Sequence, residues 1–320
     1  MLRSLAKDAA AHVASWTRLD AIARERLHTQ TPFIVGYHRV VERLDVASGF
    51  ALPAMEITAS TFEKHVDWLA QNFEIISLED FAMSRARRAT SKPLAAITFD
   101  DGYADVYENA LPVLNRKGIP AAFFVVTDLV DSGLVPVHDR LYAALNSTNV
   151  DDAFSMTQQM LRTRRHDDVL EIVEKFGCDK TSDALRPMNW SILAEMRDAG
   201  MTIGSHSKTH AFLTNESFDR VTAELRESRS ALQQHLGVAA DLFAYPGGAF
   251  NNSIVGAVRN AGYKLAFTDC HHRDNHNPSF TITRRGLWER SCLDPLGEFS
   301  PAIMSCHAAA VFGRSATCEH

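Results

Sequence analysis

The sequence lacks any uninterrupted run of about 20 apolar residues, the length that a membrane-spanning helix requires. Its first 26 residues carry apolar side chains at helical spacing, but charged residues interrupt them throughout, so the apolar centre of a signal peptide is missing too. We therefore expect a cytoplasmic chain whose residues 1–30 form an amphipathic helix. Such a helix usually packs on its own domain, and peripheral contact with the inner membrane face is the alternative.

Cysteine is also scarce, and there is no excess of positive charge. The five cysteines are odd in number and irregularly spaced, which argues against a disulfide framework and favours a reducing compartment. The 33 lysine and arginine residues stand against 39 acidic ones, for a net charge of −6. The arginine-containing stretches at 85–88 and 162–165 are typical of solvated helix faces. We therefore expect no nucleic-acid partner.

What the sequence does contain is a repeated order of short apolar runs and longer helical patterns. Hydrophobic residues make up 46% of the chain, which is ample for one large core. The apolar runs lie at 33–37, 94–99, 121–126, 201–203, 241–245 and 265–267, and helix-like segments follow at 61–72, 104–117, 191–199, 218–236 and 253–261. This order predicts an α/β protein with a mostly parallel sheet, closed as a distorted (β/α) barrel.

The alternation covers residues 31–290, which we expect to form one domain. The segment at about 128–187 departs from it, with charged helical stretches at 151–161 and 167–175 and no strand candidate. We expect a helical insertion that shapes one side of a cleft, because the segment has too few apolar residues for its own core. Residues 291–320 carry no strong signal and are expected to be a C-terminal tail.

Polar residues follow directly after several of the apolar runs. His38, Asp100, Asp101 and His206 each come just beyond the end of a run, and so does the turn Tyr245-Pro246-Gly247-Gly248. In a parallel α/β barrel the C-terminal ends of the strands form the rim where active sites are built. The pattern therefore predicts that these residues meet at one rim.

Residues at this rim include a complete ligand set for a catalytic metal. His206 and His210 form a His-x-x-x-His pair, and two neutral imidazoles with one carboxylate leave an open position for water on a zinc-type ion. The other member of the Asp100-Asp101 pair is then free to act as a base. Singly, the aspartates are typical of a turn with a helix cap, and only the joint pattern favours a metal site. The loop at 270–276 has histidines without a recognised ligand spacing, and we expect an ordinary polar loop there.

Two longer motifs surround these residues, Thr98-Phe99-Asp100-Asp101-Gly102 and Gly204-Ser205-His206-Ser207-Lys208-Thr209-His210. They closely resemble the first two motifs of polysaccharide deacetylases, the NodB-like carbohydrate esterases of family four. The resemblance extends to residues 118–124, 190–200 and 243–248, so that it covers about residues 33–290. It implies a barrel of the NodB-homology type and a catalytic domain at 31–290.

By this resemblance, Asp101, His206 and His210 hold a divalent metal, with zinc favoured and cobalt or nickel as alternatives, while Asp100 deprotonates the metal-bound water. Electrostatics supports the same division of roles between the two aspartates. A cation lowers the pKa of its bound water, and a neighbouring carboxylate can then accept the proton. The oxyanion that develops on an acetamide carbonyl would be held by the metal and by a backbone N–H near Tyr245, the position that the family uses.

Two further roles have more than one candidate. Many members of the family protonate the leaving amine from a late histidine, which His307 matches loosely, whereas His38 resembles the N-terminal Tyr-His element of the branch related to biofilm-polysaccharide deacetylases. We favour His38 because it follows a convincing strand. The arginine that often orients the base is missing at 240–242, and either Arg284 or Arg285 could substitute for it.

The resemblance thus predicts a metal-dependent hydrolase that removes N-acetyl groups from amino sugars of an oligosaccharide or polysaccharide precursor. An O-acetyl carbohydrate esterase is the nearest alternative, since the same water and oxyanion site would serve both carbonyls. Outside the enzymes, the alternative is a non-catalytic carbohydrate-binding member of a polysaccharide assembly system.

Overall fold

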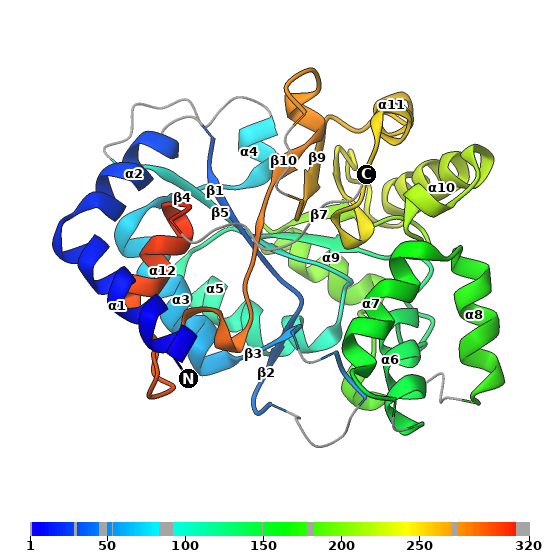
Figure 1. The fold of residues 1–320 in the computed structure, drawn as a ribbon. Coiled ribbons are helices and arrows are strands. Elements are labelled where there is room, and N and C mark those ends of the chain that lie inside the picture. Colours follow the sequence, from blue (N-terminus) through cyan, green and yellow to red (C-terminus); the bar gives the residue numbers. More distant parts are fainter. Residues whose placement is uncertain are drawn as a thin grey trace.

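A computed structural model of the 320-residue chain describes residues 2–28, 31–44, 50–52, 54–82, 92–148, 150–177, 182–270 and 274–311. At its centre lies a parallel sheet that curves into a nearly closed barrel, with helices around it (Figure 1), as the sequence predicts. The strands of the barrel are β1 (Phe33–Tyr37), β5 (Leu94–Phe99), β6 (Ala122–Val125), β7 (Thr202–Ser205), β8 (Leu242–Ala244), β9 (Leu265–Thr268), β10 (Ile282–Thr283) and β11 (Arg285–Gly286). Short strand β4 (Glu74–Ile75) adds to β5.

The barrel is completed by a single short segment of chain. The sheet runs in the order β10-β9-β8-β7-β6-β5-β1-β11, so its two ends are β10 and β11. These two strands are separated in sequence by Arg284 alone, which donates its backbone N–H to Thr268 of β9. Residues 282–286 therefore pair first with β9 and then with β1, and Arg284 lies where the pairing changes sides.

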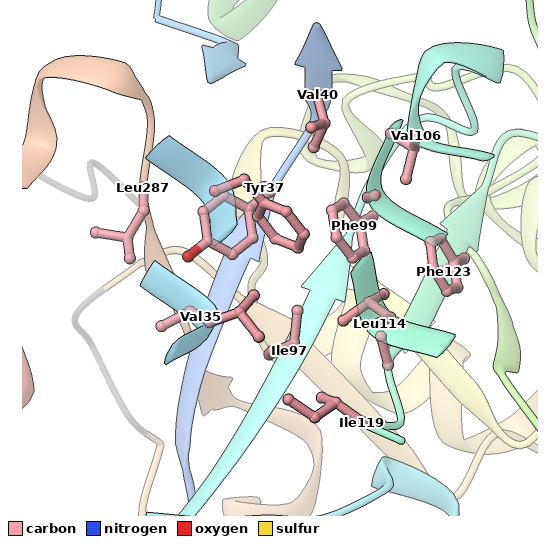
Figure 2. Packing of buried hydrophobic residues seen from close by; sticks show 14 of the residues in the cluster. Val35, Tyr37, Val40, Ile97, Phe99, Val106, Leu114, Ile119, Phe123 and Leu287 are labelled. Carbon is pink, nitrogen blue, oxygen red and sulfur yellow. The ribbon is translucent and has the colours of Figure 1, made fainter. Parts of the chain in front are cut away.

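Alternate residues of the strands face two different cores. Ile34, Ala96, Phe124 and Phe267 fill the interior of the barrel. The residues between them face outward and pack under the surrounding helices, as Figure 2 shows for Val35, Tyr37, Ile97, Phe99 and Phe123. Because both faces are covered, the strands read in the sequence as continuous apolar runs.

The helices around the barrel are α3 (Ala59–Asn72), α4 (Leu78–Ala82), α5 (Leu111–Lys117), α9 (Trp190–Asp198), α10 (Phe218–Leu236) and α11 (Asn252–Asn260), with a π-helical turn at Val106–Ala110. Several begin at side-chain caps: Thr58, Ser217 and Asn251 each accept a hydrogen bond from a backbone N–H of the first turn. Beyond the C-terminal end of β1, strands β2 (Arg39–Val41) and β3 (Glu56–Thr58) form a small second sheet.

The helical insertion consists of α6 (Val137–Ser147), α7 (Ala153–Thr163) and α8 (His166–Lys175), which lie together on one side of the barrel in Figure 1. These helices bury a small apolar core together with residues from the loops of the barrel. Its members include Leu141, Leu161 and Val173, and it is completed by Phe212 from the loop after β7. Apolar residues contributed by the barrel thus supply what the segment lacks by itself.

The N-terminal segment forms two helices, α1 (Leu2–Trp16) and α2 (Leu19–Leu27), that pack on α12 (Pro301–Ala308). Much of the predicted C-terminal tail is therefore folded against the N-terminus. Ala11 is fully buried, whereas Val13, Trp16 and Leu19 are exposed. In the described part of the chain, no helix is both long and apolar enough to cross a membrane.

The cysteine expectation is wrong at one position, because Cys270 is disulfide-bonded. Cysteine spacing along a chain does not reveal which sulfurs the fold brings together. Cys292 and Cys306 are buried thiols. The arginine-containing stretch at 162–165 is exposed as predicted, while the stretch at 85–88 and loop residues 271–273 lie outside the described residues.

Candidate metal centre

Asp101, His206 and His210 meet at the C-terminal rim of the barrel. One ligand atom from each lies within 4.8 Å of the other two, and all three residues are buried. Asp101 Oδ1 is 3.5 Å from His206 Nε2 and 3.3 Å from His210 Nε2. The structure thus brings together the three residues that the sequence proposes as ligands.

Two tight turns place these side chains. Asp101 follows β5 with a backbone φ of 69°, and after β7 Ser207 and His210 have φ values of 66° and 65°. Residues other than glycine seldom adopt this left-handed region, and such strain persists where the surroundings enforce it. In the second turn the enforcing group is the fully buried carboxylate of Glu224, which accepts hydrogen bonds from the backbone N–H groups of Lys208 and Thr209.

His206 is held in the form that a metal requires. Its Nδ1 lies 2.9 Å from the carbonyl oxygen of Ala244, an acceptor, so Nδ1 carries the proton and the lone pair of Nε2 faces Asp101. Burial lowers the pKa of His206 to about 4, which keeps the imidazole neutral at physiological pH.

Asp101 provides the test of whether a cation fits here. Both of its carboxylate oxygens are buried, and neither has a hydrogen-bond partner among the described residues. Burial would raise the pKa of Asp101, but the neighbouring imidazoles of His138 and His210 outweigh it, so the pKa lies well below its usual value. A buried, ionised carboxylate without hydrogen bonds is costly unless a cation compensates it. With two imidazoles beside it, the donor set suits a zinc-type ion.

The neighbouring aspartate, Asp100, is bound by Arg284. The guanidinium donates from Nη1 to Oδ1 at 2.7 Å and from Nη2 to Oδ2 at 2.6 Å, a two-pronged pair in which both residues are buried. Burial would raise the pKa of Asp100, but Arg284, His206 and His38 outweigh it and the pKa is lowered. Asp100 is therefore ionised and fixed in orientation.

Arg284 and Arg285, the two candidates for the arginine that orients the base, face opposite sides of the sheet. Because successive residues of a strand face opposite sides, Arg284 points into the barrel and Arg285 points away from it. Arg285 donates from Nε to His307 Nδ1 at 2.9 Å, and His307 Nε2 lies 3.0 Å from the carbonyl oxygen of Ser291. Both ring nitrogens of His307 thus have partners outside the barrel. Arg284, and not Arg285, is the arginine that contacts Asp100.

His38, the other candidate for the proton donor, lies on the side of the metal centre. It follows β1 and is half-buried. Its imidazole is among the groups that lower the pKa values of Asp100 and Asp101. The backbone N–H of Asp100 donates to the carbonyl of Tyr37, so His38, the next residue, lies beside the aspartate pair, whereas His307 lies on α12.

Tyr245, near which the oxyanion donor is expected, follows β8. Its backbone N–H donates to Phe267 of β9 at 3.0 Å, and its hydroxyl donates to the Phe280 carbonyl at 3.0 Å, so neither group is available to a substrate. Pro246 has no N–H. The next amide, that of Gly247, has no acceptor among the described residues and becomes the candidate oxyanion donor. The register of β8 on β9, which the sequence does not reveal, causes this shift of two residues.

One group at this centre was missed from the sequence. His138, in the first turn of α6, is buried with Nε2 3.7 Å from Asp101 Oδ2 and 2.7 Å from the hydroxyl of Tyr103. The Tyr103 hydroxyl also donates to Asp139. The only signal in the sequence was an adjacent His-Asp pair inside a segment interpreted as an insertion.

Comparison with known families gives a match to the polysaccharide deacetylase model over residues 87–266, more than half of the chain. A poly-β-1,6-N-acetyl-D-glucosamine N-deacetylase of Staphylococcus aureus is 22% identical over 213 residues, which cover 66% of this chain and 60% of that protein. The enzyme of the same name from Staphylococcus epidermidis is 28% identical over 106 residues, or 31% of this chain and 37% of that one. The matched region thus spans less than two thirds of the length of either curated relative.

Two solved structures share the fold. The Streptococcus pyogenes deacetylase PplD superimposes with a TM-score of 0.61 at 18% identity, covering 86% of this chain and 96% of that one. IcaB from Ammonifex degensii superimposes with a TM-score of 0.58 at 19% identity, covering 87% and 97%. At these identities the likeness establishes the barrel and not the substrate.

Proposed function

This chain belongs to the polysaccharide deacetylase family, and we propose that it is a metal-dependent hydrolase that removes N-acetyl groups from amino sugars of an oligosaccharide or polysaccharide. The observation that carries the proposal is the contrast between two adjacent carboxylates. Asp101 lies beside His206 and His210 with no hydrogen-bond partner among the described residues, whereas Asp100 is bound by Arg284. The names of the staphylococcal relatives support an N-acetylglucosamine polymer as the class of substrate.

Asp101, His206 and His210 would hold the metal, for which we propose zinc, with cobalt or nickel as alternatives. When bound, such a cation acts as a Lewis acid that lowers the pKa of water and polarises a carbonyl oxygen. Asp100 accepts the proton of the water that attacks the acetamide carbonyl, and Arg284 keeps Asp100 ionised and correctly turned for that transfer.

Two groups act on the rest of the reacting amide. The N–H of Gly247 donates to the carbonyl oxygen as negative charge develops on it. His38 donates a proton to the nitrogen as the C–N bond breaks, so that the products are acetate and a free amine. Both assignments are proposals from position: Gly247 offers the first amide without an acceptor after β8, and His38 lies beside both aspartates.

The location of the protein stays a prediction from the sequence. The disulfide at Cys270 removes the cysteine argument for a cytoplasmic location. Peripheral contact with the inner membrane face is supported by the exposed apolar side chains of Val13, Trp16 and Leu19 on the N-terminal helices.

The test is metal content together with acetate release from matched N-acetylated and O-acetylated chito-oligosaccharides. We expect about one equivalent of zinc in the purified protein, loss of zinc in Asp101→Ala and His206→Ala, and acetate from the N-acetylated substrate. Release from the O-acetylated substrate alone would make the protein an esterase. No metal after reconstitution with zinc, cobalt or nickel would refute the hydrolase mechanism.

A further inference from the structure

Three polar side chains that the proposed mechanism does not use are buried together against Asp101. Tyr103 comes from the loop after β5, and His138 and Asp139 come from the first turn of α6 in the helical insertion. Their residues are 1%, 3% and 1% exposed. Polar groups buried this deeply are expected to have a defined set of hydrogen bonds, and the direction of those bonds shows what the group does.

The hydrogen bonds of this group end on the carboxylate of Asp139. The hydroxyl of Tyr103 donates to Oδ2 of Asp139, and Oδ1 of Asp139 accepts from the backbone N–H of Leu52 at 3.1 Å. Because the hydroxyl hydrogen of Tyr103 is committed to Asp139, its oxygen must accept from His138 Nε2 at 2.7 Å. His138 is therefore the Nε2–H tautomer, and its Nδ1 has no partner among the described residues.

The same edge of the His138 ring also lies near the metal ligand Asp101. Nε2 of His138 lies 3.7 Å from Oδ2 of Asp101, whereas Oδ1 of Asp101 faces His206 and His210 at 3.5 and 3.3 Å. One oxygen of the carboxylate is thus turned toward the ligand histidines, and the other lies beside the imidazole edge of His138, without a hydrogen bond among the described residues. Rotation of the carboxylate away from the histidines would break this arrangement.

We propose that His138, held by Tyr103 and Asp139, is a positioning residue that fixes the orientation of Asp101 for metal binding. The helical insertion is then a working part of the metal centre and not only a wall of the substrate cleft. This inference rests on the proposed metal centre. It does not make His138 a ligand, because Nε2 is already engaged and, in the described part of the chain, only Asp101, His206 and His210 form a metal-sized group.

The experiment measures zinc affinity of the full chain by chelator competition, with cobalt absorption as a second readout. We expect His138→Leu and Tyr103→Phe to weaken zinc binding roughly 10- to 100-fold, the usual effect of losing a group that orients a ligand. The cobalt spectrum should keep its band positions, because the ligand set is unchanged. His138→Gln, whose amide nitrogen can replace Nε2–H, should recover part of the affinity, and His138→Asn should not.

A second buried Tyr–His pair provides matched controls. The Tyr37 hydroxyl lies 3.1 Å from His65 Nδ1, in the outer core beneath α3, and makes no contact with a ligand carboxylate. Tyr37→Phe and His65→Leu should therefore leave zinc affinity unchanged. Tyr103→Phe removes one hydroxyl, so a folding defect in His138→Leu would not decide the question alone.

The outcomes separate this inference from the function it rests on. Unchanged zinc affinity in both His138→Leu and Tyr103→Phe would overturn the positioning role while leaving the metal centre intact. Complete loss of zinc in His138→Leu, with shifted cobalt bands in Tyr103→Phe, would overturn it in favour of a fourth ligand. A parent protein that binds no zinc would overturn both proposals at once.

Discussion

Asp100 and Asp101 are neighbours in the chain and are equally buried, at 2% exposure each, yet they occupy opposite environments. Both oxygens of Asp100 accept hydrogen bonds from Arg284, while both oxygens of Asp101 lack a hydrogen-bond partner among the described residues. The protein therefore neutralises one carboxylate by itself and leaves the other for a cation. Burial alone does not distinguish a base from a ligand; the partners of each oxygen do.

The largest expected effect comes from Asp101→Asn, which tests the carboxylate that has no hydrogen bonds among the described residues. Zinc binding and activity should fall to background, because an amide replaces the only charged ligand. The free energy of unfolding of the metal-free protein should also decrease at neutral pH, because the lowered pKa of Asp101 means that the folded chain stabilises its charged form. Urea unfolding in the presence of a chelator measures this, and unchanged stability would show that the neighbouring imidazoles do not compensate the charge in the metal-free protein.

Asp100→Asn tests the carboxylate that is paired with Arg284 and should give the opposite result for zinc. Zinc should be retained, and the turnover number should fall roughly 10²- to 10⁴-fold through loss of the base. The free energy of unfolding should drop by ~3–5 kcal/mol because the buried Arg284 loses its two-pronged charged partner. Asp269→Asn is the control, because this half-buried residue touches the same arginine at 3.3 Å. Loss of zinc in Asp100→Asn would mean that the two aspartates share the metal.

Gly247→Ala should reduce turnover without altering either aspartate. An added Cβ would lie 2.1 Å from the ring of Phe212, and the φ of +60° already disfavours it. Displacement of the amide should cost about 10²- to 10³-fold in turnover if it is the oxyanion donor, with zinc affinity unchanged. Gly237→Ala has the same strain at φ +65° but no neighbour within 4 Å, so it should keep full activity. Equal loss in both variants would assign the effect to backbone strain.

The smallest effect concerns pH. The pKa of His206 is lowered to about 4 from 6.5, so between these values the unfolded chain binds a proton that the folded chain does not. Stability of the metal-free protein must therefore decrease as pH falls from 6.5 toward 4, by ~3 kcal/mol for this group. His206→Gln should flatten that slope in chelator-treated unfolding measurements. Asp100→Asn should not, because the lowered pKa of Asp100 places its titration below this window.

Much of the barrel was predictable because its strands are covered on both faces. Six strands, β1 and β5 to β9, coincide with the apolar runs of the sequence. Strands β10 and β11 were not predicted from the sequence, because each has only two residues and a charged residue separates them. The helix α6 was missed as well, since its first turn buries His138, Asp139 and Arg140 where a helical pattern calls for apolar residues.

The residues of the site also divide into those that local motifs predict and those that only the fold brings together. Asp100 with Asp101, and His206 with His210, are close along the chain, so their shared rim could be inferred from local motifs. The choice of Arg284 over Arg285 depends on which way a two-residue strand faces, and the contact of His138 with Asp101 joins residues 37 positions apart. The pairing of the Tyr245 amide with β9 depends on strand register. These three depend on tertiary placement, which a single sequence does not state.

The way the barrel is completed has a consequence for how the protein is made and assayed. During synthesis every metal ligand has left the ribosome long before Arg284, which arrives with the last segment of the barrel. A chain cut or stalled near residue 280 would carry Asp101, His206 and His210 but no partner for Asp100. Zinc content would then overcount working molecules in any preparation that contains such fragments, and titration of active sites, not metal analysis, would give the functional concentration.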